Sequence, residues 1–251
     1  MGRRLGQHFL SNPSILRRIA DAACPDATPL VVEIGPGRGA LTQHLLERSR
    51  RVVAVEVDPV LVAYLRHKFR DRPEFSVIEA DALTADLAQW GPAVVAGNLP
   101  YYITSPILSR VFSLGAAWRG SVFLVQKEVA ERLTARPGSR DYGYLTAQTN
   151  LHALPEYLFT VARGAFSPPP KVESAVVRLA PRDARADFGI DDLPAFESFV
   201  SACFRHKRKT LRNNLAEDYG RDRLDAIPAA SKRGEQMPIP DLLALYRALT
   251  A

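Results

Sequence analysis

The chain has 251 residues, enough for one sizeable α/β core and a small second domain. With 47% hydrophobic and 24% charged residues, its composition is that of a folded protein and excludes a largely disordered one. The net charge of +6 favours an anionic partner such as nucleic acid. Two cysteines are too few for a disulfide framework or a zinc cluster, and no stretch resembles a signal peptide or a membrane span. We therefore expect a cytoplasmic protein that uses no metal.

Two helices are expected to begin with a capping residue followed by proline. Asn12-Pro13 comes after a basic N-terminal stretch that has neither the period of a strand nor that of a helix, and Asp58-Pro59 repeats the pattern. The expected apolar stripes are Ile15, Leu16 and Ile19 in the first helix, and Val60, Leu61, Tyr64, Leu65 and Phe69 in the second.

A glycine-rich turn lies between these two helix starts. The apolar run 30–34 predicts a strand buried on both faces, and Gly35, Gly37 and Gly39 follow it. Glycines let the chain turn sharply and let its backbone approach a ligand closely. Residues 40–46 have helical spacing, so strand, loop and helix form the first unit of an open α/β sheet. Because the glycines alternate instead of following G-x-G-x-x-G, we expect a nucleotide-like ligand but not the NAD pattern.

Acidic residues lie at the ends of the next two predicted strands. Glu56 follows the glycines by about twenty residues, where a carboxylate can accept hydrogen bonds from ribose hydroxyls. Asp81 ends a third strand over 75–81 and therefore lies at the same carboxyl edge of the sheet. One such acid can be a helix cap, but two beside a glycine loop favour an adenosine-containing cofactor.

The fourth predicted strand, 93–97, runs directly into Asn98-Leu99-Pro100-Tyr101. Ser105-Pro106 is expected to cap a further helix, which places the tetrapeptide in a short loop at the same edge of the sheet. An amide, a rigid proline turn and an exposed aromatic ring would seat a flat polar ring, although Asn and Pro occur in any turn.

The chemistry of adenine gives this tetrapeptide a specific interpretation. The exocyclic amine of adenine is a poor nucleophile because its lone pair is delocalised into the ring. The side-chain oxygen of Asn98 and the carbonyl of Leu99 would accept both amine hydrogens and localise that lone pair. Tyr101 would stack on the base and hold it in line with an activated methyl group. The sulfonium of S-adenosylmethionine would supply the driving force, with no metal and no strong general base.

The next part of the chain continues the sheet. A strand over 121–126 is followed by residues 127–133 in helical register, and then by a basic, glycine-rich and aromatic loop over 136–144. Such a loop either contacts RNA phosphates and bases or is a solvated connector. The proline-rich segment 166–171 is stiff and leads into a last strand over 173–179.

The C-terminal part is expected to be a small helical appendage. Residues 181–187 have no apolar period and are typical of a linker, and amphipathic helices follow, the last over 240–249. The cations of residues 205–212 form either a solvated face or a phosphate-contacting patch, and the lack of an interleaved acid favours the patch. They are Arg205, Lys207, Arg208, Lys209 and Arg212.

Together these motifs resemble the ribosomal RNA adenine dimethyltransferases of the KsgA/Dim type over essentially the whole chain. The matching segments are residues 6–10, 33–39, 98–101, 126–133, 136–139, 166–172 and 208–213.

The resemblance implies an α/β fold with two domains. A Rossmann-like class I S-adenosylmethionine-dependent methyltransferase domain would span 1–182, including a cofactor-site segment over 1–12, and a helical rRNA-binding domain would span 188–251. The implied reaction transfers methyl groups from S-adenosylmethionine to N6 of two adjacent adenosines in the 3′-terminal hairpin of 16S rRNA, leaving S-adenosylhomocysteine. The implied partner is the assembling small (30S) ribosomal subunit, and we expect the enzyme to act as a monomer.

The resemblance also assigns roles to individual residues. Glu56 would hold the ribose and Asp81 the adenine amine of the cofactor, while Asn98, Leu99 and Tyr101 attend the target base. The complete implied cofactor set is His8, Leu10, Gly35, Glu56, Asp81 and Asn98. The expected RNA contacts are Arg136, Arg140, Lys171, Arg205, Lys207, Arg208, Lys209 and Arg212.

Two other functions stay open from the sequence. The 23S rRNA adenine methyltransferases that confer macrolide resistance share the 98–101 motif, although segments 126–133, 137–139 and 208–213 favour the small-subunit type. A non-catalytic RNA-binding assembly factor is the second alternative, but such a protein would not need the glycine loop, Glu56, Asp81 and Asn98 together. Fold alone decides neither question.

Overall fold

The computed structural model of the chain describes residues 8–250 and contains two compact units. Of the described residues, 8–130 and 156–181 form the first unit, and 131–155 and 182–250 form the second. Our sequence boundaries placed 131–155 in the methyltransferase domain, whereas these residues pack with the C-terminal part of the chain. The division into functional domains at 182 and 188 stays a prediction.

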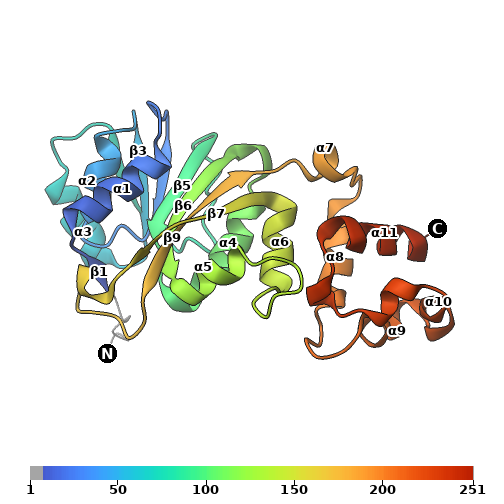
Figure 1. Cartoon of the computed structure of the whole chain (residues 1–251). Coiled ribbons are helices and arrows are strands. Elements are labelled where there is room, and N and C mark those ends of the chain that lie inside the picture. Colours follow the sequence, from blue (N-terminus) through green and yellow to red (C-terminus); the bar gives the residue numbers. More distant parts are fainter. Residues whose placement is uncertain (1–7, 251) are drawn as a thin grey trace. The chain divides into compact units, whose positions relative to one another are not determined.

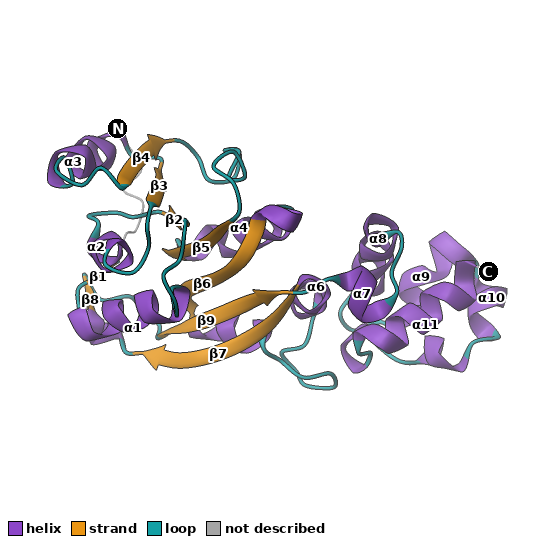
Figure 2. Cartoon of the chain, turned by 90° about the horizontal axis from the view of Figure 1, so that it is seen from above, coloured by secondary structure: helices purple, strands orange, loops and turns teal. Residues whose placement is uncertain are grey.

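A sheet forms the centre of the first unit (Figure 1), and its seven strands have the order β4-β3-β2-β5-β6-β9-β7, which can be followed in Figure 2. Strands β2 to β6 pair in parallel, and β9 is antiparallel to β6. The carboxyl ends of β2, β3, β4 and β5 therefore meet at one edge of the sheet, where ligands bind in such folds. The strands are β2 (Val31–Ile34), β3 (Val52–Glu56), β4 (Phe75–Glu79), β5 (Ala93–Asn98), β6 (Trp118–Gln126), β7 (Ala153–Val161) and β9 (Ser174–Pro181).

Helices cover both faces of this sheet. Figure 2 shows α1, α2 and α3 on one side and α4 on the other. All residues of β2 and β3 are buried, which explains why apolar and β-branched residues predominate in both strands. The helices of this unit are α1 (Pro13–Ala23), α2 (Ala40–Leu46), α3 (Pro59–Lys68) and α4 (Thr104–Phe112), and α5 (Lys127–Leu133) runs from the first unit into the second.

Both expected helix starts are confirmed. The side-chain oxygen of Asn12 accepts from the backbone N–H groups of Ser14 and Ile15 at 3.0 and 3.2 Å, and Asp58 accepts from Val60 N at 2.8 Å. The Asn12 cap precedes α1 and the Asp58 cap precedes α3.

The apolar stripe expected in α3 is partly wrong. Val60 is 74% exposed and Tyr64 is 46% exposed, whereas Val62 and Leu65 are buried against the sheet. Because apolar residues occur all round this helix, their spacing does not decide which stripe faces the core.

A short two-stranded sheet joins the N-terminal segment to the proline-rich segment. Strand β1 (Phe9–Leu10) pairs antiparallel with β8 (Phe166–Ser167), and Ser11 N donates to the Ala165 carbonyl at 3.0 Å. The N-terminal segment, which showed no strand period in the sequence, is thus held by residues more than 150 positions away. Residues 6 and 7 of the motif lie outside the described part of the chain.

The second unit is helical and has its own core. Tyr142, Ala147 and Leu151 are buried in this core together with C-terminal residues such as Phe196 and Leu242. Its helices are α6 (Tyr144–His152), α7 (Ala184–Phe188), α8 (Leu193–Cys203), α9 (Leu211–Tyr219), α10 (Arg221–Asp225) and α11 (Ile239–Thr250), and its 3₁₀ turns include η4 (Pro228–Ser231) and η5 (Gly234–Gln236).

The linker expected over 181–187 is wrong, because α7 occupies most of it. The Asp183 side chain caps this helix by accepting from Arg185 N and Ala186 N at 3.0 and 3.1 Å. The helix is too short to show an apolar period, since Ala184 is buried in the core and Phe188 packs against it at the last position. Within residues 8–250, no helix combines the length and apolar character that a bilayer span requires.

Candidate active site

A cavity of about 340 Å³ lies at the carboxyl edge of the sheet. Its lining comes from the ends of β2, β3 and β5, from the turn after β4, and from residues 8–10. The structure brings to this cavity all eight residues that the sequence proposed for catalysis or cofactor binding. They are His8, Leu10, Gly35, Glu56, Asp81, Asn98, Leu99 and Tyr101.

The glycine loop forms one wall of the cavity in a conformation that only glycine adopts easily. Gly35, Gly37 and Gly39 have φ values of +64°, +57° and +71°. A Cβ at Gly37 would lie 3.0 Å from the Phe9 ring, and one at Gly39 would lie 2.7 Å from the Phe69 ring. The loop is therefore fixed both by backbone conformation and by close packing of aromatic rings.

Glu56 connects the end of β3 to this loop. Its Oε1 accepts from Val57 N and Asp58 N at 3.0 and 3.1 Å, and its Oε2 accepts from Gly37 N at 3.2 Å. Burial raises the pKa of this carboxyl group, while the three backbone hydrogen bonds act in the opposite direction. A carboxylate offers about four lone-pair positions, so an acceptor position remains for a ligand hydroxyl.

Asp81 lies in the turn after β4. Its Oδ1 accepts from Leu83 N at 2.9 Å, so the carboxylate organises its own turn while it lines the cavity. From the sequence, Asp81 was either a helix cap or a ligand-binding group. The geometry of its side chain is compatible with both roles.

A further carboxyl group, Glu33, was missed as a site residue by the sequence reasoning. It lies on β2, is 1% exposed, lines the cavity, and accepts from Thr42 Oγ1 at 2.6 Å. Burial raises the pKa of Glu33 to about 7, and the charge of Glu56 adds to the increase. An acid within an otherwise apolar buried strand was the signal that could have identified it.

Lys68 is the second residue that the sequence reasoning missed. Its Nζ donates to the carbonyls of Arg38 and Gly39 at 2.9 and 3.4 Å, so α3 holds the glycine loop from outside the cavity. Partial burial lowers the pKa of Lys68, and the Glu33 carboxylate opposes that effect. The only sequence signal was the position of a lysine at the end of the neighbouring helix.

Asn98 is oriented by the N-terminal segment. Its Nδ2 donates to the His8 carbonyl at 3.1 Å, and within residues 8–250 its Oδ1 has no hydrogen-bond donor. The Leu99 N–H donates to the Leu124 carbonyl at 3.0 Å, which fixes the next peptide against β6. The Leu99 carbonyl likewise has no donor in the described chain. Two oriented acceptors are thus available at the cavity.

Tyr101 is fixed at the rim of the same cavity. Its hydroxyl and that of the buried Ser174 are 2.6 Å apart, and burial raises the pKa of the phenol. The His8 ring lies in a stacked arrangement with the Tyr101 ring at a centroid distance of 6.3 Å, and its Nδ1 donates to the Pro168 carbonyl at 2.8 Å.

The helix after the tetrapeptide does not begin as expected. Tyr101–Ile103 forms a 3₁₀ turn, and α4 starts at Thr104, so Ser105 lies inside the helix and is not its cap. The Thr104 hydroxyl instead donates to the Pro100 carbonyl at 3.3 Å and closes the turn. The two tyrosines of this turn differ in environment, because Tyr102 is 67% exposed.

The eight cations proposed to contact RNA lie on both units. Lys171 is exposed on the first unit, next to the proline-rich segment, and Arg136 and Arg140 are exposed on the second. Arg205 and Arg212 form ion pairs with acids of α9 and α10, which lie beyond the basic cluster in the sequence. RNA binding by these residues stays a prediction.

The fold and the site together define a class I methyltransferase. The sheet is parallel except for an antiparallel strand inserted near one edge, a glycine loop follows the first parallel strand, and acids lie at the ends of the following strands. A family profile described as ribosomal RNA adenine dimethylase matches residues 2–243, and the chain belongs to this family.

Individual proteins agree with this assignment. The chain is 42% identical to the ribosomal RNA small subunit methyltransferase A of Acidobacterium capsulatum, over 98% of this chain and 90% of that protein. It is also 42% identical to the protein of that name in Bordetella pertussis, over 99% and 94%. Among solved structures, a dimethyladenosine transferase from Plasmodium falciparum superposes with a TM-score of 0.82 at 26% identity, covering 95% of this chain and 96% of that one. The 23S rRNA methyltransferase ErmE gives 0.72 at 32% identity, covering 97% and 100%.

Proposed function

We propose that this protein transfers methyl groups from S-adenosylmethionine to N6 of two adjacent adenosines in the 3′-terminal hairpin of 16S rRNA, in the small ribosomal subunit. The observation that carries the proposal is the pair of free acceptors, Asn98 Oδ1 and the Leu99 carbonyl, at a cavity built by the glycine loop and three carboxyl groups. The names of the relatives support the choice of the small subunit.

The residues of the cavity fit S-adenosylmethionine. Gly35 and Gly37 line the cavity with backbone that carries no side chain, and Glu56 retains an acceptor position for a ribose hydroxyl. Asp81, which lines the same cavity, would accept from the adenine amine of the cofactor. The carboxylates of Glu56 and Asp81 suit a ligand that carries positive charge. When bound, S-adenosylmethionine would supply an electrophilic methyl group on its sulfonium.

The residues around the target base would activate it by position and by electrostatics. Asn98 Oδ1 and the Leu99 carbonyl would accept the two amine hydrogens, which localises the nitrogen lone pair and stabilises the ammonium that forms in the transition state. Because His8 holds the other end of the Asn98 amide, the acceptor is oriented before the substrate arrives. Tyr101 would stack on the base, with its ring fixed by Ser174. The proton can leave to water afterwards, so no strong base is required.

The target base must leave its stack to reach this loop. An assembling subunit, in which the hairpin is still accessible, is therefore the expected partner. We expect the enzyme to act on this particle as a monomer.

The function is tested by transfer of labelled methyl groups to purified unmethylated small and large ribosomal subunits, followed by nucleoside analysis. Label recovered as N6,N6-dimethyladenosine in the small subunit alone is the expected result. Label in the large subunit would select the alternative function, methylation of 23S rRNA. No label in either subunit, with binding retained, would identify an RNA-binding assembly factor.

The role of Asn98 is tested separately. Asn98→Ala should lower the rate constant for methylation by at least about a hundredfold, because removing one oriented acceptor from a transition state has effects of this order. Binding of S-adenosylhomocysteine, measured by calorimetry, should persist. A variant that keeps half of normal activity would contradict the assignment.

A further inference from the structure

The cations of residues 205–212 fall into two groups. The guanidinium of Arg205 lies 3.0 Å from the Asp218 carboxylate and 3.6 Å from that of Glu217, and Arg212 binds both oxygens of Asp225. These two arginines fasten the segment to α9 and α10, so the sequence pattern overstates the number of cations that are free to bind a ligand.

The second group lies on a tight turn between α8 and α9. Lys209 N donates to the His206 carbonyl at 3.0 Å, which closes a turn with Lys207 and Arg208 at its two central positions. Within residues 8–250, the side chains of Arg208 and Lys209 have no hydrogen-bond or ion-pair partner. Three consecutive cations repel one another, so the turn does not gain its shape from its own side chains.

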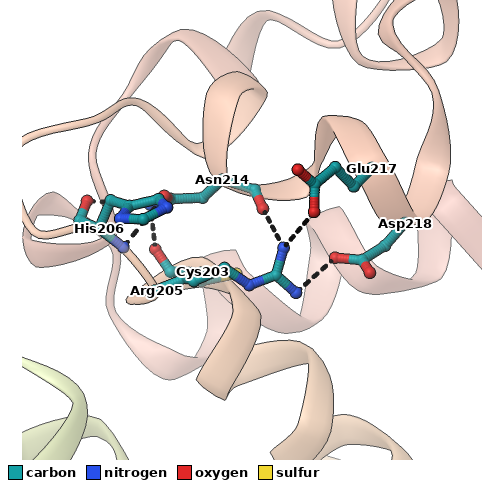
Figure 3. A network of polar contacts seen from close by, with 6 residues as sticks. All are labelled: Cys203, Arg205, His206, Asn214, Glu217 and Asp218. Atoms are coloured by element: carbon teal, nitrogen blue, oxygen red, sulfur yellow. Dashed lines mark hydrogen bonds and ion pairs between the residues drawn. The ribbon is translucent and has the colours of Figure 1, made fainter.

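A single buried amide holds this turn (Figure 3). Asn214 is 2% exposed, and its Nδ2 donates to the carbonyls of Cys203 and His206 at 2.8 and 3.2 Å. Its Oδ1 accepts from His206 N at 3.2 Å. One side chain thus satisfies both backbone groups of His206 and the last carbonyl of α8. Arg205 adds a bond from its guanidinium to the Asn214 carbonyl at 3.2 Å.

The turn is also attached to two neighbouring segments of the second unit. Lys207 Nζ donates to the Arg140 carbonyl at 3.1 Å, which joins the turn to the segment predicted as a basic loop over 136–144. Leu211 N donates to the Lys232 carbonyl at 2.8 Å. The free cations therefore belong to a surface with a fixed backbone.

We propose that Asn214 is a positioning residue for RNA binding, whose buried amide fixes the 206–209 turn so that Arg208 and Lys209 bind the phosphate backbone of the substrate RNA. The proposal rests on the proposed function for the identity of that RNA. In this arrangement Asn214 touches no RNA itself, and Arg205 and Arg212 hold the flanks of the turn. Phosphates suit the site because two unpaired cations on a rigid turn lose little freedom when they bind.

The experiment measures binding of the full-length chain to unmethylated small ribosomal subunits at several salt concentrations. Asn214→Leu keeps the size of the side chain and removes all three of its hydrogen bonds. Asn213→Leu is the matched control, because Asn213 is the exposed neighbour on the same helix. Both changes are also made in an Arg208→Ala/Lys209→Ala background.

Asn214→Leu should weaken binding about tenfold and reduce the salt slope by about two, the effect of losing two phosphate contacts. In the background without Arg208 and Lys209 it should weaken binding less than about twofold, because the cations that it positions are already gone. The rate constant at saturating subunit should change little, and Asn213→Leu should have no effect in either background.

Equal weakening by Asn214→Leu in both backgrounds would overturn the proposal, since general destabilisation does not depend on these two cations. Hydrogen exchange of the wild-type chain gives a second test that needs no variant. The His206 and Lys209 amides should be protected like those of the adjoining helices, and exchange at the rate of an open loop would also overturn the proposal. Failure of the proposed function is distinguishable, because wild type itself would then not methylate the small subunit, whether or not it binds that subunit.

Discussion

Glu33 should make the stability of the first unit depend on pH in a specific direction. Its pKa is about 7 in the folded chain, against 4.5 for an unperturbed glutamate. The folded state therefore keeps a proton that the unfolded state has already lost between these two pH values. Stability should fall as pH rises through this window, and a shift of this size corresponds to about 3 kcal/mol.

Glu33→Gln isolates this contribution, because glutamine resembles the protonated acid and can still accept from Thr42. At pH 8 the variant should be more stable than wild type by about 3 kcal/mol, and at pH 4 the two should be nearly equal. Both tryptophans, Trp90 and Trp118, lie in the first unit, so their fluorescence in urea titrations follows that unit alone.

The matched control is Glu79→Gln, which replaces an exposed carboxylate at the end of β4. Its free energy of unfolding should differ little from that of wild type at either pH. The reasoning would be refuted if the difference between wild type and Glu33→Gln were the same at pH 4 and pH 8.

Three further outcomes are expected. Gly97→Ala would place a Cβ 2.4 Å from the Ile34 carbonyl oxygen, and it should destabilise the first unit by at least about 2 kcal/mol in the same urea titrations. The control is Gly164→Ala, whose Cβ would meet nothing within 4 Å, and it should be nearly neutral. Tyr101→Phe loses only the hydrogen bond to Ser174, about 1 kcal/mol, and should slow methylation by less than about tenfold. Tyr101→Ala also removes the ring and should slow methylation far more. Equal rates for the two variants would argue against stacking of this ring on the base. Burial raises the pKa of Cys203 well above its usual range and also raises that of Cys24, so thiol reagents at pH 8 should label neither residue until urea unfolds the chain.

Local patterns in the sequence were sufficient for the central part of the fold. The apolar runs of β2 and β3, the glycine loop and the capping pairs before α1 and α3 are each encoded within a few consecutive residues. Once these strands are parallel, their carboxyl ends must meet, so the positions of Glu56, Asp81 and Asn98 around one cavity followed from topology. Helix α6 and strand β7 were missed, because α6 has no marked apolar face and β7 contains a proline and many partly exposed residues.

The contacts that fix the site could not be predicted in the same way. Asn98 is oriented by His8, 90 residues earlier, and Tyr101 by Ser174, 73 residues later. Arg205 meets Asp218 only because α8 and α9 pack together. Such partners depend on which surfaces the fold brings together, and no local pattern in a single sequence predicts them.

Residues 131–155 belong to the second unit, and this limits where the enzyme can be truncated. The chain leaves the first unit after residue 130, returns at 156 within β7, and leaves again after 181. A protein shortened at residue 182 would keep 131–155 but lose the helices that bury Tyr142, Ala147 and Leu151, and would expose those apolar side chains. The C-terminal residues are therefore no detachable module, and an exchange of the second unit between relatives would have to replace both segments at once.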